Sequence, residues 1–399
     1  MTAVSEDSHS FLFRTLRMIV LLSAPIMAGM VQLAVIPAQT GMAAYFAGKG
    51  GDGAFAAQLV MTVAAPSMAF GAPLIGWLAG KLGKRNTLIA AMLIYAVAGV
   101  AGAYASDLYS LLATRFILGI AAAGYVTIAV SFIGDYYPGE GARDRLLGWF
   151  AVVGGGGSLV VLKAAGWLTE HNGWQGPFFL YIVPLPLLVM GLFLIREVKQ
   201  TDTAAVAAGS DSIWSAWSIY ALITLLAVSF YTVTIQGTYM MAENGIMDPS
   251  TYANVMIFST IGSMLGAFVF RFIMPALGFH MTLALVWAFL IVGNLGFPLT
   301  ANVVLLATCA GAVGMASGLM QPLTQTTVLN MVAPSASARA MGMALGCIFL
   351  GQFINPFVFK ALLPFVGLHG AFLWMGAASA VGAVFAALWR LKGGVRAAA

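Results

Sequence analysis

Three basic residues stand inside long apolar stretches of this sequence: Arg115, Lys163 and Lys360. A charge inside an apolar helix is costly, so such a residue usually faces a watery cavity or a partner. Cationic side chains in such a cavity would attract an anionic or zwitterionic solute. Each residue also has a second explanation, because a long basic side chain near a helix end can extend to the membrane surface.

Amide and hydroxyl side chains recur at helical spacings in further apolar stretches. Gln236, Tyr239 and Glu243 follow one another at three and four residues, which places them on one helix face. Such groups either hydrogen-bond a solute or bond between helices. Glu243 is the candidate for proton exchange, with an ordinary residue at the membrane surface as the alternative. The candidate polar residues are Gln32, Gln39, Gln236, Tyr239, Glu243, Gln321, Gln325, Gln352 and Asn355.

The composition shows which elements must position these residues. The chain has 399 residues, of which 61% are hydrophobic and 8% charged, and its mean hydropathy is +0.95. Soluble domains average about 45–50% apolar and about 25% charged residues. The sequence therefore predicts an integral membrane protein, and it excludes cytosolic enzymes, nucleic-acid binders and disordered scaffolds.

A helix that spans a membrane needs about 20 largely apolar residues. Segments bounded by charges, Gly-Asp loops and prolines predict twelve such helices. We expect an all-α membrane protein with spans at 15–46, 54–80, 86–105, 108–134, 145–168, 176–195, 214–241, 251–274, 280–300, 302–331, 340–365 and 368–390.

The basic residues indicate the orientation. With both termini in the cytoplasm, all but four of the 18 lysines and arginines fall in cytoplasmic segments or at the cytoplasmic ends of the spans. Lys49 alone falls in an outside loop, and the other three lie within spans. This distribution is typical of membrane proteins, whose cytoplasmic loops carry the excess of Lys and Arg.

The spans divide into two groups of six. A polar segment at 197–213 separates a half at 1–196 from a half at 214–399, and we interpret it as a cytoplasmic linker. Two related halves imply a solute site near the middle of the membrane, opened by rocking one half against the other. The residues that repeat at an offset near 195 are Pro138 and Arg143 with Pro334 and Arg339, Gly83 with Gly278, and Gly119 and Gly124 with Gly314 and Gly318.

The loop from Gly76 to Arg85 resembles the signature loop of the major facilitator superfamily, and the resemblance extends over essentially the whole chain. The segment around Arg115 is similar to that family's arginine motif in the fourth span. The chain departs from the family at Gly80, where the signature has an aspartate. The resemblance implies a cytoplasmic gate, with Asp135 or Glu197 as acidic partners. Its residues are Gly76, Gly80, Gly83, Lys84, Arg85, Asp135 and Arg143.

The resemblance is strongest to the 12-helix drug/metabolite:proton antiporter group, although the glycine run from Gly154 to Gly157 lacks the Gly-Pro pair of that group. It implies a secondary active transporter that moves a small anionic or amphipathic organic solute by alternating access, with proton-coupled export. Import of an organic anion and a non-transporting membrane sensor are the alternatives. We expect Arg115 and Lys163 to answer the charge of the solute and Glu243 to carry the proton.

The sequence does not indicate an enzyme. The four histidines fall in predicted loops or the tail, and no metal cluster or phosphate-binding loop is found. We expect no cofactor, no metal and no nucleic-acid partner. The expected partners are the solute, protons and the lipid bilayer, and the expected setting is a monomer in a bacterial inner membrane.

Overall fold

The structure is a computed structural model, and it describes residues 3–136, 140–197, 213–332 and 337–391. Within these ranges the regular secondary structure is entirely helical. Nine stretches of the described residues are long and apolar enough to cross a membrane. This confirms the helical membrane class.

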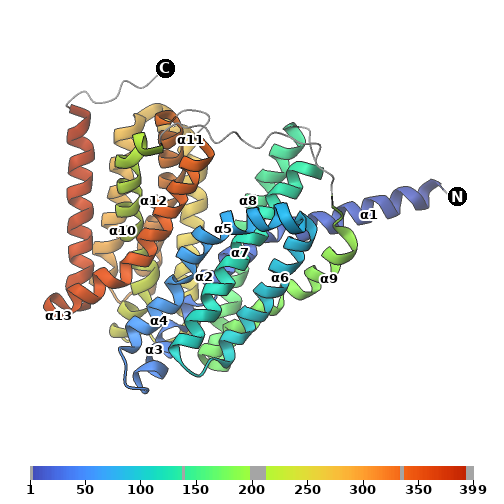
Figure 1. Cartoon of the computed structure of the whole chain (residues 1–399). Helices are drawn as coiled ribbons and strands as arrows, with labels where there is room; N and C mark the ends of the chain where they lie inside the picture. Colours follow the sequence, from blue (N-terminus) through green and yellow to red (C-terminus); the bar gives the residue numbers. More distant parts are fainter. Residues whose placement is uncertain (1–2, 137–139, 198–212, 333–336, 392–399) are drawn as a thin grey trace. The chain divides into compact units, whose positions relative to one another are not determined.

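The chain forms two compact units, and residues 39–59 group with the second one. The first unit contains α1 (Ala3–Leu22), α2 (Ala24–Leu33), α5 (Ala64–Leu82), α6 (Lys84–Ala101), α7 (Leu108–Tyr136), α8 (Glu140–Asn172) and α9 (Pro184–Leu194). The second unit contains α3 (Gln39–Ala47), the start of α4 (Gly53–Thr62), α10 (Trp217–Glu243), α11 (Pro249–Gly296), α12 (Val303–Met331) and α13 (Ser337–Leu391), as labelled in Figure 1. The predicted linker at 197–213 lies, apart from its end residues, outside the described residues.

Nine stretches stand where twelve spans were predicted, because three of the stretches are much longer than one crossing requires. They contain 47, 51 and 48 residues. α11 is interrupted at Gly278 (φ 72°) and α13 at Gly367 (φ 67°), both in the left-handed region that glycine adopts without strain. In the stretch of 47 residues, Gly148–Leu194, the 3-10 segment Gly173–Ile182 separates α8 from α9. The two glycines lie in the gaps predicted between spans 251–274 and 280–300 and between spans 340–365 and 368–390.

Local sequence explains where two of these helices begin. The Asp248 carboxylate accepts hydrogen bonds from the backbone N–H groups of Ser250 and Thr251, and Pro249 occupies the first turn of α11. The Asn302 side chain caps α12 in the same way. Capping by Asp or Asn satisfies backbone donors that the first helical turn leaves unpaired, and proline fits the first turn because it has no N–H.

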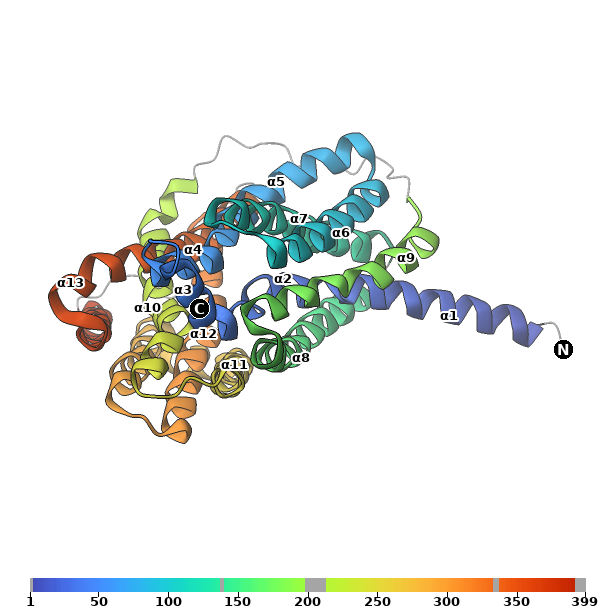
Figure 2. The same ribbon diagram turned by 90° about the horizontal axis from the view of Figure 1, so that it is seen from below.

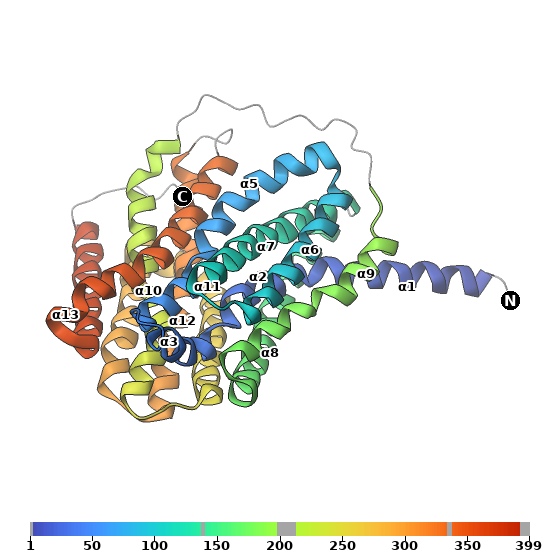
Figure 3. The same cartoon turned by 60° about the horizontal axis from the view of Figure 1, so that its bottom comes forward.

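In the first unit, α7 packs against both α5 and α6, and Figure 2 shows the three helices side by side. The α5–α7 contact is close because small residues face each other. A side chain at Gly119 would overlap Ala64 and Ser67, and one at Gly71 would overlap the backbone of Ile120. α9 lies along α6 (Figure 3).

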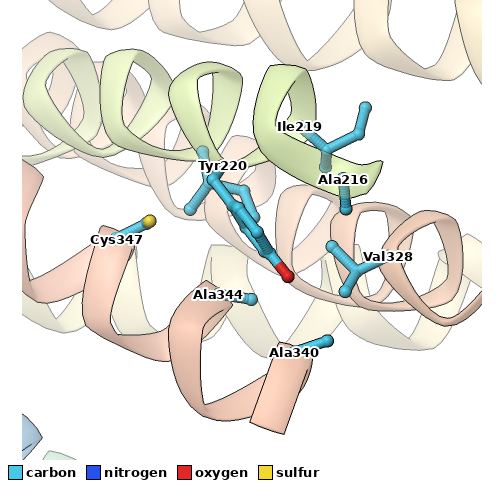
Figure 4. Packing of buried hydrophobic residues seen from close by; sticks show 8 residues of the cluster. Ala216, Ile219, Tyr220, Val328, Ala340, Ala344 and Cys347 are labelled. Carbon is cyan, nitrogen blue, oxygen red and sulfur yellow. The ribbon is translucent and has the colours of Figure 1, made fainter. Parts of the chain in front are cut away.

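In the second unit, α11 and α12 make a contact of the same kind. A side chain at Gly314 would overlap Ser259, and one at Gly266 would overlap Met315. These pairs are the pairs of the α5–α7 contact displaced by the predicted repeat offset. Figure 4 shows another contact of this unit, where the Tyr220 side chain of α10 extends toward Val328 of α12 and Ala344 of α13.

Candidate functional site

Arg115 is buried in the first unit, with 1% of its surface exposed. Its Nη1 donates a hydrogen bond to the Tyr181 hydroxyl over 2.7 Å, and its Nη2 donates to the Val31 carbonyl. Tyr181 in turn donates to the Met30 carbonyl over 3.1 Å. Among the described residues no carboxylate forms an ion pair with Arg115, so carbonyl and hydroxyl dipoles balance its charge.

The backbone of the first predicted span makes this arrangement possible. α2 ends at Leu33, and a 3-10 turn follows at Ile36–Ala38. The Val35 N–H therefore donates to the Gln32 carbonyl, three residues back, instead of to Val31 four residues back. The Val31 carbonyl thus remains available to the Arg115 guanidinium.

A buried polar cluster lies in the second unit, formed by Gln58, Thr232, Gln236 and Asn355. Gln58 and Gln236 exchange two amide hydrogen bonds of 2.8 and 3.1 Å. Nε2 of Gln236 also donates to Oδ1 of Asn355 over 3.2 Å, and Nδ2 of Asn355 donates to Oγ1 of Thr232 over 3.1 Å. The cluster therefore joins three helices, α4, α10 and α13.

Helical spacing in the sequence points to Gln236 and Asn355 but not to Gln58. Gln58 is the only amide in the predicted span 54–80, so no second amide at helical spacing draws attention to it. Its partner lies 178 residues further along the chain. Tyr181 was missed for the same reason, since it contacts Arg115 across 66 residues.

The structure distributes the other predicted polar residues between the interior and the surface. Gln39 and Gln352 are buried, Gln32 is partly buried, and Tyr239 donates a hydrogen bond of 3.3 Å to the Ala54 carbonyl. Gln321, Gln325 and Lys163 are exposed. The structure therefore does not gather all the predicted polar residues at one buried place.

Two half-exposed carboxylate contacts involve predicted pathway residues of the second unit. The Glu243 carboxylate lies 3.7 Å from Nε2 of His369, and Nζ of Lys360 lies 3.6 Å from the Asp52 carboxylate. The Lys360 ammonium also stands 3.9 Å from the centre of the Phe55 ring. Both Glu243 and Lys360 thus lie among charged or aromatic neighbours at an accessible surface, and neither is enclosed by apolar side chains.

The predicted gate residues meet at the start of α6. Nζ of Lys84 donates to the Asp135 carboxylate over 2.7 Å. The Glu197 carboxylate accepts the backbone N–H groups of Lys84 and Arg85, each over 2.8 Å. A carboxylate is favoured there because the first N–H groups of a helix have no intrahelical partner.

The loop before α6 turns at Gly83, whose φ of 85° and ψ of 149° belong to a region that glycine alone adopts readily. Arg85 holds the other side of the loop by donating to the Ile195 and Leu192 carbonyls. Gly76 and Gly80 are exposed, and a side chain at either would meet open space. The Arg143 side chain lies outside the part of the chain that the structure describes.

Known proteins resemble this chain in both sequence and fold. The niacin transporter NiaP of Acinetobacter baylyi is 31% identical over 142 residues, which cover 36% of this chain and 31% of that protein. The puromycin resistance protein pur8 of Streptomyces alboniger is 31% identical over 146 residues, which cover 36% of this chain and 29% of that protein. The chain thus matches about a third of the length of these relatives.

The fold is similar to that of the nucleoside transporter NupG, with a TM-score of 0.74 over 93% of this chain and 98% of that one, at 15% identity. The sequence profile of the Major Facilitator Superfamily matches residues 11–242, which is more than half of the chain. The helical membrane-spanning units described above agree with that assignment. The chain is a member of the Major Facilitator Superfamily, a family of transporters and not of enzymes.

Proposed function

We propose that this protein is a secondary active transporter that moves a small anionic or amphipathic organic solute by alternating access, with proton-coupled export. Membership in the superfamily is the observation that carries the proposal. The names of the two relatives, a niacin transporter and a puromycin resistance protein, support a small organic solute. Three cationic side chains, Arg115, Lys163 and Lys360, lie in membrane-spanning stretches. Lys360 is paired with Asp52, whereas no described carboxylate forms an ion pair with Arg115, which favours a solute with a negative charge.

The proposal includes twelve crossings, two six-helix halves at 1–196 and 214–399, and both termini in the cytoplasm. Three of the nine apolar stretches are long enough for two crossings each, and helix breaks at Gly278, Gly367 and the 3-10 segment Gly173–Ile182 support this division. The corresponding glycine contacts of the two units support the repeat. A bacterial inner membrane and a monomeric state complete the proposal.

Separate residues carry the separate tasks in this proposal. Glu243 exchanges the proton, and its half-exposed position beside His369 supports access from water. The ion pair of Lys84 with Asp135 and the Glu197 carboxylate stabilise the cytoplasmic gate in one of its states. The buried amides Gln236 and Asn355 form part of the solute pathway.

Flux measurements in proteoliposomes test the proposal. The purified protein is reconstituted, a pH gradient is imposed, and the movement of niacin, puromycin and methyl viologen is followed as probes of an anionic, an amphipathic and a dicationic solute. Solute movement in the direction opposite to the protons supports export by antiport. Loss of that movement in Glu243→Gln supports Glu243 as the proton carrier.

Three results contradict parts of the proposal. Flux in the same direction as the protons indicates import. Preference for methyl viologen overturns the anionic class. Absence of flux for every probe, with a thermal shift on binding, indicates the non-transporting sensor.

A further inference from the structure

A cavity of about 780 Å³ lies within the second unit, between α10, α11 and α13. Its walls are built almost entirely of apolar side chains, among them Trp217, Leu225, Trp287 and Phe385. Cavities that hold drug-sized molecules have volumes of about 300–1,000 Å³ and predominantly apolar walls with a few polar groups. This cavity has the size and the lining of a ligand site.

The residues at the open side of the cavity are apolar and exposed, as expected of a surface that faces lipid. Trp217, Leu225, Val381 and Phe385 line the cavity and are each more than 60% exposed. Large apolar side chains that remain exposed on a membrane-spanning helix contact the hydrocarbon of the bilayer. From Trp217 to Ser229 the wall extends for about 18 Å along α10, at about 1.5 Å per residue, which is similar to the thickness of one leaflet's hydrocarbon layer, about 15 Å. A molecule dissolved in that leaflet can therefore enter from the side.

Two buried hydroxyl groups, those of Ser229 and Ser379, also line the cavity. Their oxygens lie 2.8 Å apart, and Ser379 donates its proton to the Met375 carbonyl over 2.8 Å. Ser229 must therefore be the donor to Ser379. Both hydroxyl protons are thus in use, and each oxygen retains a lone pair.

Asn294 lies behind Ser229 and does not itself line the cavity. Its Nδ2 donates to the Ser229 hydroxyl over 2.9 Å and to the Ser229 carbonyl over 3.3 Å. The carbonyl can only accept, so this contact identifies which amide atom is the nitrogen. Oδ1 of Asn294 is buried and has no hydrogen-bond partner among the described residues. Of these groups only the Ser229 and Ser379 oxygens line the cavity, and each offers a lone pair but no free proton.

We propose that this cavity binds one lipophilic molecule of drug size that carries a hydrogen-bond donor, such as a hydroxyl or amine. The apolar walls hold the body of the molecule, and its donor pairs with the hydroxyl oxygen of Ser229 or Ser379. A plain acyl chain would fill the same walls and leave those acceptors unpaired. The site is separate from the polar cluster, because α13 presents Ile354 and Val358 to the cavity while Asn355 bonds to Gln236. The proposal does not depend on the direction, the coupling or the substrate of transport.

Photolabelling of the full-length protein in lipid nanodiscs tests this site. The probes are a medium-chain alcohol bearing an alkyl diazirine and its methyl ether, which differ only in the hydroxyl donor. Mass spectrometry of the peptides locates the adducts. We expect adducts of the alcohol on residues 217–229 and 375–386, at about threefold to tenfold higher yield than those of the ether, the ratio that one net hydrogen bond gives.

Matched variants separate the cavity from the surrounding lipid-facing surface. Ala378 lines the cavity, whereas its exposed neighbour Ala377 does not. We expect Ala378→Trp to abolish labelling at these helices and Ala377→Trp to leave it unchanged. Ser379→Ala removes one of the two hydroxyl acceptors that line the cavity, and we expect it to lower the yield of the alcohol toward that of the ether.

Two results overturn the proposal. Equal yields from alcohol and ether in the wild-type protein mean that the cavity accepts hydrocarbon only, as a lipid chain would provide. Adducts spread over the exposed apolar helices and unaffected by Ala378→Trp mean that there is no site. The comparison of the two probes on the wild-type protein decides between these outcomes even where a variant fails to fold.

Discussion

The guanidinium of Arg115 donates a hydrogen bond to the Val31 carbonyl at the point where α2 ends and a 3-10 turn begins. The charge of a fourth-span residue thus stabilises an irregular backbone segment of the first span. This contact lies within one unit and gives Arg115 a structural task besides the proposed attraction of the solute.

Replacing Arg115 tests this structural task. Arg115→Met leaves the Val31 carbonyl and the Tyr181 hydroxyl without their charged donor, and we expect the free energy of unfolding to fall by about 1.5–3 kcal/mol. Lys163→Met, at an exposed position, is the control and should change stability little. Unfolding of the purified protein in detergent measures both. Equal stability of Arg115→Met and wild type would show that the bonds to Val31 and Tyr181 do not stabilise the fold.

The buried amide pair of Gln58 and Gln236 predicts a measurable coupling between two positions that are distant in sequence. Each single change to leucine removes both hydrogen bonds between the two amides, whereas the double change removes the amides themselves. We expect a coupling energy of about 0.6–1.7 kcal/mol, the range for polar contacts between membrane helices. Thermal unfolding of wild type, both single variants and the double variant gives this energy. Strict additivity would contradict the contact, and Gln321→Leu at an exposed position serves as the control.

The ion pair of Lys84 and Asp135 is largely sheltered, with 16% and 14% of the two side chains exposed. We expect Lys84→Met or Asp135→Asn to lower stability by about 1 kcal/mol, since surface pairs contribute less and hydrogen bonds to buried charges more. The exchanged pair, Lys84→Asp with Asp135→Lys, should recover part of that loss. A double variant no more stable than the worse single variant would argue against a direct pair.

Two glycines of α7 provide a matched test of the close contact with α5. A methyl group at Gly119 would overlap Ala64, whereas one at Gly134 would meet open space. We expect Gly119→Ala to lower the free energy of unfolding by about 1–3 kcal/mol through overpacking. Gly134→Ala should raise stability by up to about 1 kcal/mol because alanine favours the helix. Similar effects of the two changes would show that the contact of α5 with α7 is looser than described.

The sequence was sufficient to predict the helical elements because their signal is local. A run of apolar residues and a flanking glycine lie within one short window, and the predicted break between residues 274 and 280 contains Gly278. The repeat was detectable for a similar reason, since equal glycine contacts require equal spacings along both parts of the chain.

The candidate site was only partly predictable. Helical spacing selected Gln236 and Asn355, but it cannot show which side chain lies opposite, and Gln58 was therefore missed. One partner of Arg115 is the backbone carbonyl of Val31, a group that every residue type has, so the residue type does not reveal it. The exposure of Glu243 depends on how the end of α10 meets α13 beside the break at Gly367, and a single helix face does not contain that information.

The grouping of residues 39–59 with the second unit has a consequence for biosynthesis. A fragment that begins after residue 213 would contain Gln236 and Lys360 without Gln58 and Asp52, their partners in the intact chain. It would leave one buried amide and one ion pair incomplete. The ribosome makes residues 39–59 first, so this segment is already present in the membrane when the later helices emerge. The order of synthesis thus supplies the second unit with a part that its own half of the gene does not encode.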